Sequence, residues 1–127
     1  MTERVTGIGG IFFKAKDPKA MYAWYEKHLG PKFEAGKGFV DFESKDSQTG
    51  EEAHTYWSLF KSDTKYLDPS TSPFMINYRV ADMDAMLSAL ESEGVKILGK
   101  QDDEYGRFAW IMDPEGNKIE LWAPPKK

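Results

Sequence analysis

Few side chains in this chain of 127 residues are equipped for catalysis or metal binding. The sequence has no cysteine, which excludes thiolate nucleophiles and cysteine-ligated metals, and only two histidines, His28 and His54. The residue best placed for chemistry is Glu120, in the stretch YGRFAWIMDPEGNKIELW at residues 105–122. A carboxylate held in a cavity can act as a general base, a metal ligand or an anchor for a polar ligand. Glu120 is therefore the candidate catalytic residue.

The stretch around Glu120 has the pattern of a β-hairpin. Residues 113–117, DPEGN, supply the side-chain acceptor, the fixed φ and the glycine that a tight turn needs. After the turn, Ile119 and Leu121 alternate with Glu120 and Trp122. If Ile119 and Leu121 pack beneath a helix, Glu120 and Trp122 face the other side of the sheet, which is either solvent or a cavity.

The rest of the chain is predicted to position this hairpin with two helices and several strands. The helices are expected over residues 17–29 and 82–92, each opened by an aspartate suited to N-capping and followed by a glycine. Alternating β-branched and aromatic residues predict strands over 5–14, 32–34, 38–44, 53–61, 74–80, 95–100 and the two arms of the hairpin. The order strand, helix, strand, strand, strand thus occurs twice. Such a repeat indicates two supersecondary units that share one core.

The predicted organisation is a single α+β domain of residues 1–127. The first module covers about 1–61, a turn-rich linker covers 62–73, and the second module covers about 74–123.

The charge, hydropathy and aromatic content of the chain exclude some classes of function and favour others. The net charge is −4, and the 17 basic residues are interleaved with 21 acidic ones, so no basic stripe is available and nucleic-acid binding is not expected. No apolar run has the length of a membrane span or of a signal-peptide core, so we expect no membrane association and a cytoplasmic location. The aromatic content of 14% is high, and suggests that some aromatic side chains line a pocket or an interface.

The chain resembles the vicinal oxygen chelate superfamily, which includes glyoxalase I, extradiol dioxygenases and bleomycin resistance proteins. The resemblance covers nearly the whole chain and is carried by GIGGIFFKAKDPKAMYAWYEKHLG at the start and GRFAWIMDPEGNKIELWAPP at the end. It implies two βαβββ modules that form a curved eight-stranded sheet around a concave cavity. It also implies a homodimer, because members of the superfamily close their sheet edges and apolar rims by pairing modules within or between chains.

Metal-dependent members of the superfamily take their ligands from the first and last strands of each module. The matching positions here are Gly10, Ser58, Met75 and Glu120, of which only Glu120 can ligate a transition metal well. We therefore expect no metal and no cofactor, with a divalent metal at Glu120 as the alternative. A shift in the register of its strand could bring His54 toward the cavity, and its role stays open.

The expected ligand-binding face is rich in aromatic side chains and has few polar groups. Its members are Phe12, Tyr56, Ser58, Met75, Asn77, Arg79, Trp110 and Trp122. Such a surface suits a small, partly apolar ligand. Arg79 and Arg107 are the candidate counter-ions of Glu120, and an ion pair there would be structural as easily as functional.

Three functions remain open at this point. The favoured one is a glyoxalase-like or bleomycin-resistance-like protein with a degenerate metal site, which binds a small, partly apolar ligand in the concave cavity without catalysis. The second is a glyoxalase-like lyase or isomerase that uses Glu120 as a general base or metal ligand. The third is a non-catalytic structural or regulatory module whose hollow is filled by its own aromatic side chains.

Overall fold

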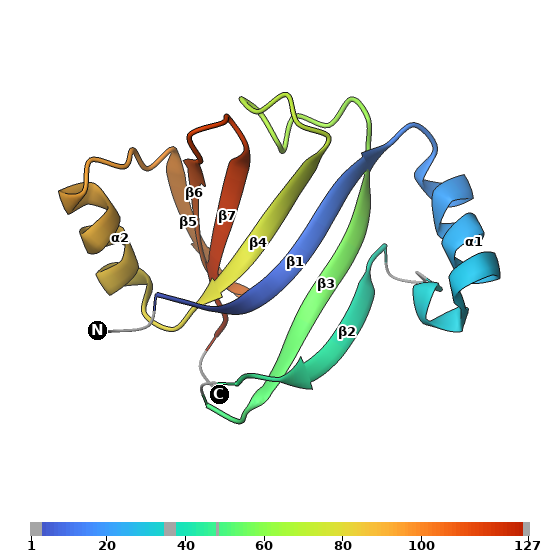
Figure 1. Cartoon of the computed structure of the whole chain (residues 1–127), viewed down its shortest axis with the longest axis horizontal. Coiled ribbons are helices and arrows are strands. Elements are labelled where there is room, and N and C mark those ends of the chain that lie inside the picture. The colour runs from blue at the N-terminus through green and yellow to red at the C-terminus, as the bar shows by residue number, and fades with distance from the viewer. Residues whose placement is uncertain (1–3, 35–37, 48, 126–127) are drawn as a thin grey trace.

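The computed structural model describes residues 4–34, 38–47 and 49–125. This part of the chain forms an α+β fold with two helices and one mixed sheet of seven strands (Figure 1). The first half contains β1 (Val5–Ala15), α1 (Pro18–Leu29), a 3₁₀ turn (Pro31–Phe33), β2 (Val40–Lys45) and β3 (Glu52–Lys61). The second half contains β4 (Phe74–Val80), α2 (Met83–Ser92), β5 (Gly99–Asp103), β6 (Gly106–Met112) and β7 (Lys118–Ala123).

The sheet shows the internal repeat directly. Its strand order is β2-β3-β1-β4-β7-β6-β5, and the two halves meet where β1 pairs antiparallel with β4. In each half the first strand pairs parallel with the last, β1 with β3 and β4 with β7, while the other pairs within each half are antiparallel. This arrangement is consistent with two βαβββ modules.

The helix predictions are confirmed to within one residue at their starts. The side chain of Asp17 accepts a hydrogen bond from the backbone N–H of Ala20 at 3.1 Å, and that of Asp82 accepts one from Ala85 at 3.0 Å. These bonds satisfy backbone donors that a helix start otherwise leaves unpaired. None of the helices in the described residues is both long enough and apolar enough to cross a membrane.

The strand predictions need one correction. The expected strand over residues 32–34 is instead the 3₁₀ turn Pro31–Phe33, so the described residues form seven strands rather than eight. The reason is local: Gly30 adopts a φ of 110°, and Pro31 has no N–H to give to a sheet ladder. The strand expected at 95–100 begins later, at Gly99.

Both helices pack on the same face of the sheet. Ile11 contacts the core under α1, Ile119 contacts the core under α2, and both are cross-strand partners of Ile76. Residues that face one another across paired strands lie on one side of a sheet. Neither of the two helices in the described residues therefore lies on the opposite face, and this is the face on which the alternation in β7 places Glu120.

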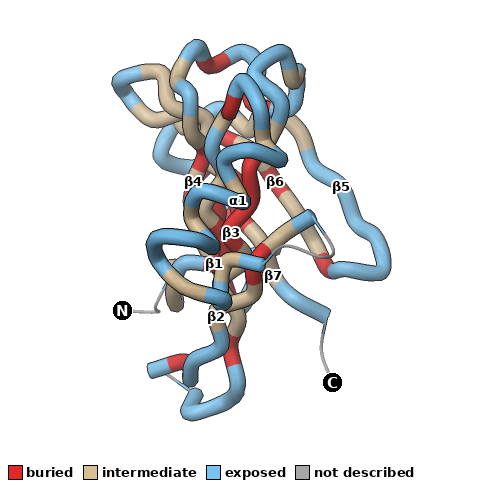
Figure 2. Tube along the Cα trace, turned by 90° about the vertical axis from the view of Figure 1, so that its right-hand side faces the viewer, coloured by how far each residue is buried: buried red, intermediate tan, exposed pale blue. Residues whose placement is uncertain are grey.

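The two helices are buried to different extents. The core under α2 contains Met83, Met86, Leu87 and Leu90 of the helix together with Val80, Ala109, Ile111 and Leu121 of the sheet. By contrast, α1 has no buried residue, and Figure 2 shows it as a mostly exposed segment. It contacts the sheet through the half-buried rings of Tyr22 and Tyr25, which pack on the core that contains Trp57.

Candidate functional site

The helix-free face collects the side chains that the sequence marks as site residues. One row of cross-strand partners runs from Tyr56 through Gly10 and Asn77 to Glu120 and Trp110. The next rows contain the partners Ser58, Phe12 and Met75 on one side, and the partners Arg79 and Trp122 on the other. All the expected ligand-binding residues thus share one face, and Glu120 lies near its centre.

Glu120 is buried and accepts hydrogen bonds from three side chains. Its side chain is only 3% exposed. The Asn77 side chain donates to Oε1 at 2.7 Å, the Trp110 indole donates to Oε2 at 2.9 Å, and the Tyr66 hydroxyl donates to the same Oε2. In the described part of the chain all three of these contacts donate to the carboxylate, which accepts at both oxygens. These bonds occupy three of the roughly four acceptor positions of the carboxylate, and movement of Tyr66, the most exposed of the three donor residues, would free another.

Tyr66 is a site residue that the sequence does not reveal. It belongs to residues 62–73, which carry no helix or strand, and its ring is 40% exposed although its hydroxyl reaches buried Glu120. Burial raises the pKa of Tyr66, and the negative charge and hydrogen bond of Glu120 raise it further. A tyrosine in a turn-rich linker has no periodic pattern, so no sequence signal points it toward the sheet.

Lys118 fixes Tyr66 from the other side. Its ammonium donates to the backbone carbonyl of Tyr66 at 2.7 Å and lies over the rings of Tyr66 and Trp110, 5.4 and 5.6 Å from their centroids. Burial lowers the pKa of Lys118, and the charge of Glu120 opposes that shift. The linker is thereby held against the sheet at Glu120.

Seven aromatic rings form a continuous series around Glu120, which we call the aromatic arc. Neighbouring ring centroids are 5.4 to 6.4 Å apart. In order the rings are Phe12, Phe60, Tyr66, Trp110, Phe108, Trp122 and Tyr56. Such separations are those of directly contacting aromatic side chains. Apart from Tyr66, which is more exposed, the rings are half-buried and so combine packing with an accessible surface.

The expected counter-ions of Glu120 do not reach it. Arg79 instead donates from one guanidinium nitrogen to the backbone carbonyls of Ile8 and His54, at 2.7 and 2.8 Å. Arg107 forms ion pairs with Asp84 and Asp102. Of the two possibilities left open by the sequence, the structure shows the one without an arginine–carboxylate pair, and neutral donors contact Glu120.

The four positions at which related proteins hold a metal do not fit one here. Gly10 has no side chain, Met75 is completely buried and offers only a thioether, and Ser58 offers only a hydroxyl. Both oxygens of Glu120 already accept hydrogen bonds. A transition-metal site needs about three converging imidazole, carboxylate or thiolate ligands, and these positions provide one.

A separate group of potential ligands lies at the β2–β3 end of the same face. Ligand atoms of Asp41, Glu43 and His54 lie within 4.8 Å of one another, close enough to share one cation. His54 Nδ1 lies 2.8 Å from Asp41, and Nε2 lies 3.3 Å from Glu52. The ring of His54 also stacks on Tyr56 at 5.8 Å, which connects this group to the aromatic arc.

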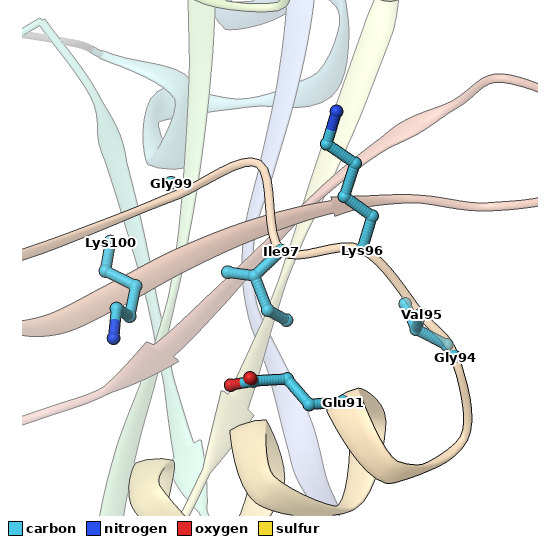
Figure 3. A pocket seen from close by; sticks show the side chains of 7 residues that line it. All are labelled: Glu91, Gly94, Val95, Lys96, Ile97, Gly99 and Lys100. Atoms are coloured by element: carbon cyan, nitrogen blue, oxygen red, sulfur yellow. The ribbon is translucent and has the colours of Figure 1, made fainter.

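Two surface depressions lie away from these residues. One, of about 490 Å³, lies between the end of α2 and the start of β5 (Figure 3). Its side chains come from Glu91, Val95, Lys96, Ile97 and Lys100. The other is bordered by residues 81–84, Arg107 and residues 123–125. Neither includes Glu120 or a ring of the aromatic arc, so the candidate site is defined by its side chains.

Comparison with protein-family models gives a match over residues 7–121 to the Glyoxalase/Bleomycin resistance protein/Dioxygenase superfamily. The chain belongs to this superfamily. The resemblance to the vicinal oxygen chelate proteins is thereby confirmed, as are the two helices and the mixed sheet expected from it. No curated protein matches the chain.

Several solved structures of the superfamily's fold are similar to this chain. Methylmalonyl-CoA epimerase from Mycobacterium tuberculosis is 23% identical, with 99% of this chain and 93% of that chain covered and a TM-score of 0.58. The Streptomyces coelicolor methylmalonyl-CoA epimerase E43Q, in complex with 2-nitronate-propionyl-CoA, is 19% identical, with 96% and 99% covered and a TM-score of 0.66. A Legionella pneumophila chain described as NAD-dependent benzaldehyde dehydrogenase is 16% identical, with 91% and 98% covered and a TM-score of 0.61. At these identities the similarity concerns the fold.

Proposed function

We propose that this member of the superfamily binds a small, partly apolar ligand in a concave cavity on the helix-free face of the sheet, without a metal at the superfamily's four positions. The observation that carries the proposal is the aromatic arc around the buried pair of Asn77 and Glu120. Ligand sites in proteins are mostly apolar and aromatic, with a few placed polar groups that fix orientation. The arc supplies the rings, and the centre supplies the polar groups.

The state of Glu120 favours binding over catalysis. A general base needs a free lone pair within reach of the proton that it removes. Three of the roughly four acceptor positions of Glu120 already accept hydrogen bonds from Asn77, Trp110 and Tyr66, which leaves little of the carboxylate for that role. A carboxylate held in this way can orient a ligand by charge while its own position stays fixed.

Saturation-transfer NMR with indole as a flat, partly apolar probe tests the proposal. We expect saturable transfer to indole that weakens by about tenfold in Trp122→Leu, because this change keeps the volume but removes the ring. Trp24→Phe is the matched control, since Trp24 lies exposed on α1 and its ring belongs to a different face. Absence of transfer, or equal transfer in Trp122→Leu, would contradict the proposal.

A second candidate function is a lyase or isomerase that uses Glu120 as a general base. The contact between the Tyr66 hydroxyl and Glu120 favours it, because the pair joins a proton donor to an acceptor. The test is deuterium uptake at the acidic carbon of methylmalonyl-CoA in heavy water, with Glu120→Gln as the control. Uptake that disappears in Glu120→Gln would support the enzyme, whereas the binding function predicts no uptake in either protein.

A further inference from the structure

We propose that the ligand of the aromatic arc is an organic cation: a flat apolar body that carries a protonated amine or an amidinium group. This inference rests on the proposed function and adds the charge of the ligand to it.

The negative groups of the helix-free face are grouped along the arc. Glu120 lies buried at its centre. Asp41 is the cross-strand partner of Tyr56, Glu43 is that of His54, and Glu52 lies 3.3 Å from the His54 ring. The charges of Asp41, Glu43 and Glu52 act on Tyr56, whose pKa is raised first by burial and then by these carboxylates. A ligand that approaches the arc at Tyr56 therefore meets negative potential.

Two cations on this face, Arg79 and Lys118, donate to backbone carbonyls, and a third, Lys14, lies at the other end of the arc as the cross-strand partner of Phe60. Arg79 donates to the carbonyls of Ile8 and His54, and its guanidinium lies so close to Gly7 that a Cβ there would stand 2.2 Å from one of its nitrogens. Lys118 donates to the carbonyl of Tyr66. Arg79 Nε has no hydrogen-bond partner in the described residues, but it is buried, so an anionic ligand near Glu120 would gain little from these cations.

The groups in direct contact at the centre of the site, Asn77 and Glu120, include an acceptor without a partner in the part of the chain that the structure describes. Within the described residues Asn77 Oδ1 is buried and has no hydrogen-bond partner. The orientation of this amide follows from its other end, because the atom that contacts the Glu120 carboxylate at 2.7 Å must be the NH₂ donor. Asn77 Oδ1 and Glu120 together favour a ligand that donates hydrogen bonds.

The arc already binds one ammonium group of its own. The ammonium of Lys118 lies over the rings of Tyr66 and Trp110 at 5.4 and 5.6 Å, inside the range for cation–π attraction. The rings of Phe108, Trp122 and Tyr56 continue the same series and have no such cation in the described residues. These three rings are the surface on which a ligand cation would lie.

Three probes of nearly equal shape separate charge from apolar contact: benzamidinium, benzamide and benzoate. Each is titrated at neutral pH while the indole N–H signals of the protein are followed by NMR. We expect the Trp122 signal to move, and benzamidinium to bind about tenfold more tightly than benzamide, with benzoate weakest.

In Glu120→Gln the advantage of benzamidinium should fall to about threefold or less, while benzamide still binds. Glu91→Gln removes the same charge at α2 and should leave the ranking unchanged.

The outcomes distinguish the proposed charge of the ligand from the proposed ligand-binding function. Equal binding of benzamidinium and benzamide, or tightest binding of benzoate, overturns the cationic ligand and leaves the ligand-binding function intact. Failure of all three probes and of indole to bind overturns both. Because Glu120→Gln disturbs a buried group, the double variant Asp41→Asn, Glu43→Gln provides a second test at exposed or half-buried positions. An unchanged preference for benzamidinium in the folded double variant would show that these carboxylates do not set the ligand charge, which also counts against the inference.

Discussion

Glu120 is stabilised by its hydrogen bonds, and no residue of the described chain forms an ion pair with it. Moving a carboxylate out of water costs several kcal/mol of free energy unless the carboxylate is paired or hydrogen-bonded. Here Asn77, Trp110 and Tyr66 provide those bonds, and two of the three donors come from strands adjacent to β7. The arrangement depends on the carboxylate being an acceptor at both oxygens.

Glu120→Gln should therefore destabilise the fold more than removal of a single donor. If the amide NH₂ of a glutamine faces the Tyr66 and Trp110 pair, donor meets donor, and if it faces Asn77, that buried amide must turn its Oδ1 toward it. We expect a loss of about 2–3 kcal/mol in the free energy of unfolding, against about 1–2 kcal/mol for Tyr66→Phe. Urea denaturation measures both. Equal stability of Glu120→Gln and the wild type would mean that these hydrogen bonds are not formed.

Tyr66 should make stability fall at alkaline pH. Its folded-state pKa is raised above the unfolded value by burial first and then by Glu120. The stabilisation is therefore complete below the unfolded pKa of about 10 and is lost as pH rises from there toward the folded pKa. Between about pH 9 and 11 the free energy of unfolding should fall more steeply in the wild type than in Tyr66→Phe, by up to about 1.4 kcal/mol per pH unit. The exposed Tyr105→Phe is the control, and a steeper loss in Tyr66→Phe would contradict the assignment.

At the scale of residues, the face of the sheet on which a side chain lies could be predicted from the sequence, but its hydrogen-bond partners could not. The sequence places Glu120 on the other face of its strand from Ile119 and Leu121, and the structure agrees. It does not reveal that Arg79 turns to backbone carbonyls or that Tyr66 folds back from the linker, because both depend on three-dimensional contacts between segments distant in sequence.

Among the elements, β1 is the most unusual strand. Its pairing with β4 shifts register between Val5 and Gly7 and again between Ile8 and Gly10. Its paired register with β3 begins only at Gly10, and beyond that point Arg79 bridges the two strands through the carbonyls of Ile8 and His54. The glycines leave room for this side chain, as bulges with small residues commonly do.

Gly9→Ala should disrupt this region. A Cβ at Gly9 would stand 2.4 Å from Asn77 Oδ1 and 2.7 Å from the Trp122 ring, so the strand or the site must shift. We expect a loss of about 3 kcal/mol in thermal or urea unfolding, together with weaker indole binding. Gly99→Ala in β5 is the control, because its Cβ would meet only Trp110 at an ordinary 3.6 Å. If both variants unfold like the wild type, the close packing around Gly9 is not a feature of the molecule.

The elements were predictable where local chemistry determines them. Asp17 and Asp82 start the helices as expected, and the 113–117 turn joins β6 to β7. The short strand expected over 32–34 fails because the proline and glycine before it favour a turn, and β-propensity alone outweighed that signal in the prediction.

The whole molecule leaves apolar surface and two sheet edges uncovered. The sheet ends at β2 on one side and β5 on the other. No residue of α1 is buried, whereas Trp24 and Leu29 on that helix are 53% and 57% exposed. Free edges and apolar surface are features that oligomers cover.

A homodimer is accordingly predicted for the chain in solution. Multi-angle light scattering across the micromolar range should give twice the chain mass of 14.5 kDa. A constant monomer mass over that range would contradict the prediction and would leave the ligand site to be formed by one chain.

The most direct test of metal-independent ligand binding is calorimetric titration of indole into protein dialysed against EDTA. The wild type should bind about one indole per chain with the same affinity before and after EDTA, Trp24→Phe should match it, and Trp122→Leu should bind about tenfold more weakly. Binding that disappears with EDTA, or that is unchanged in Trp122→Leu, would contradict the account.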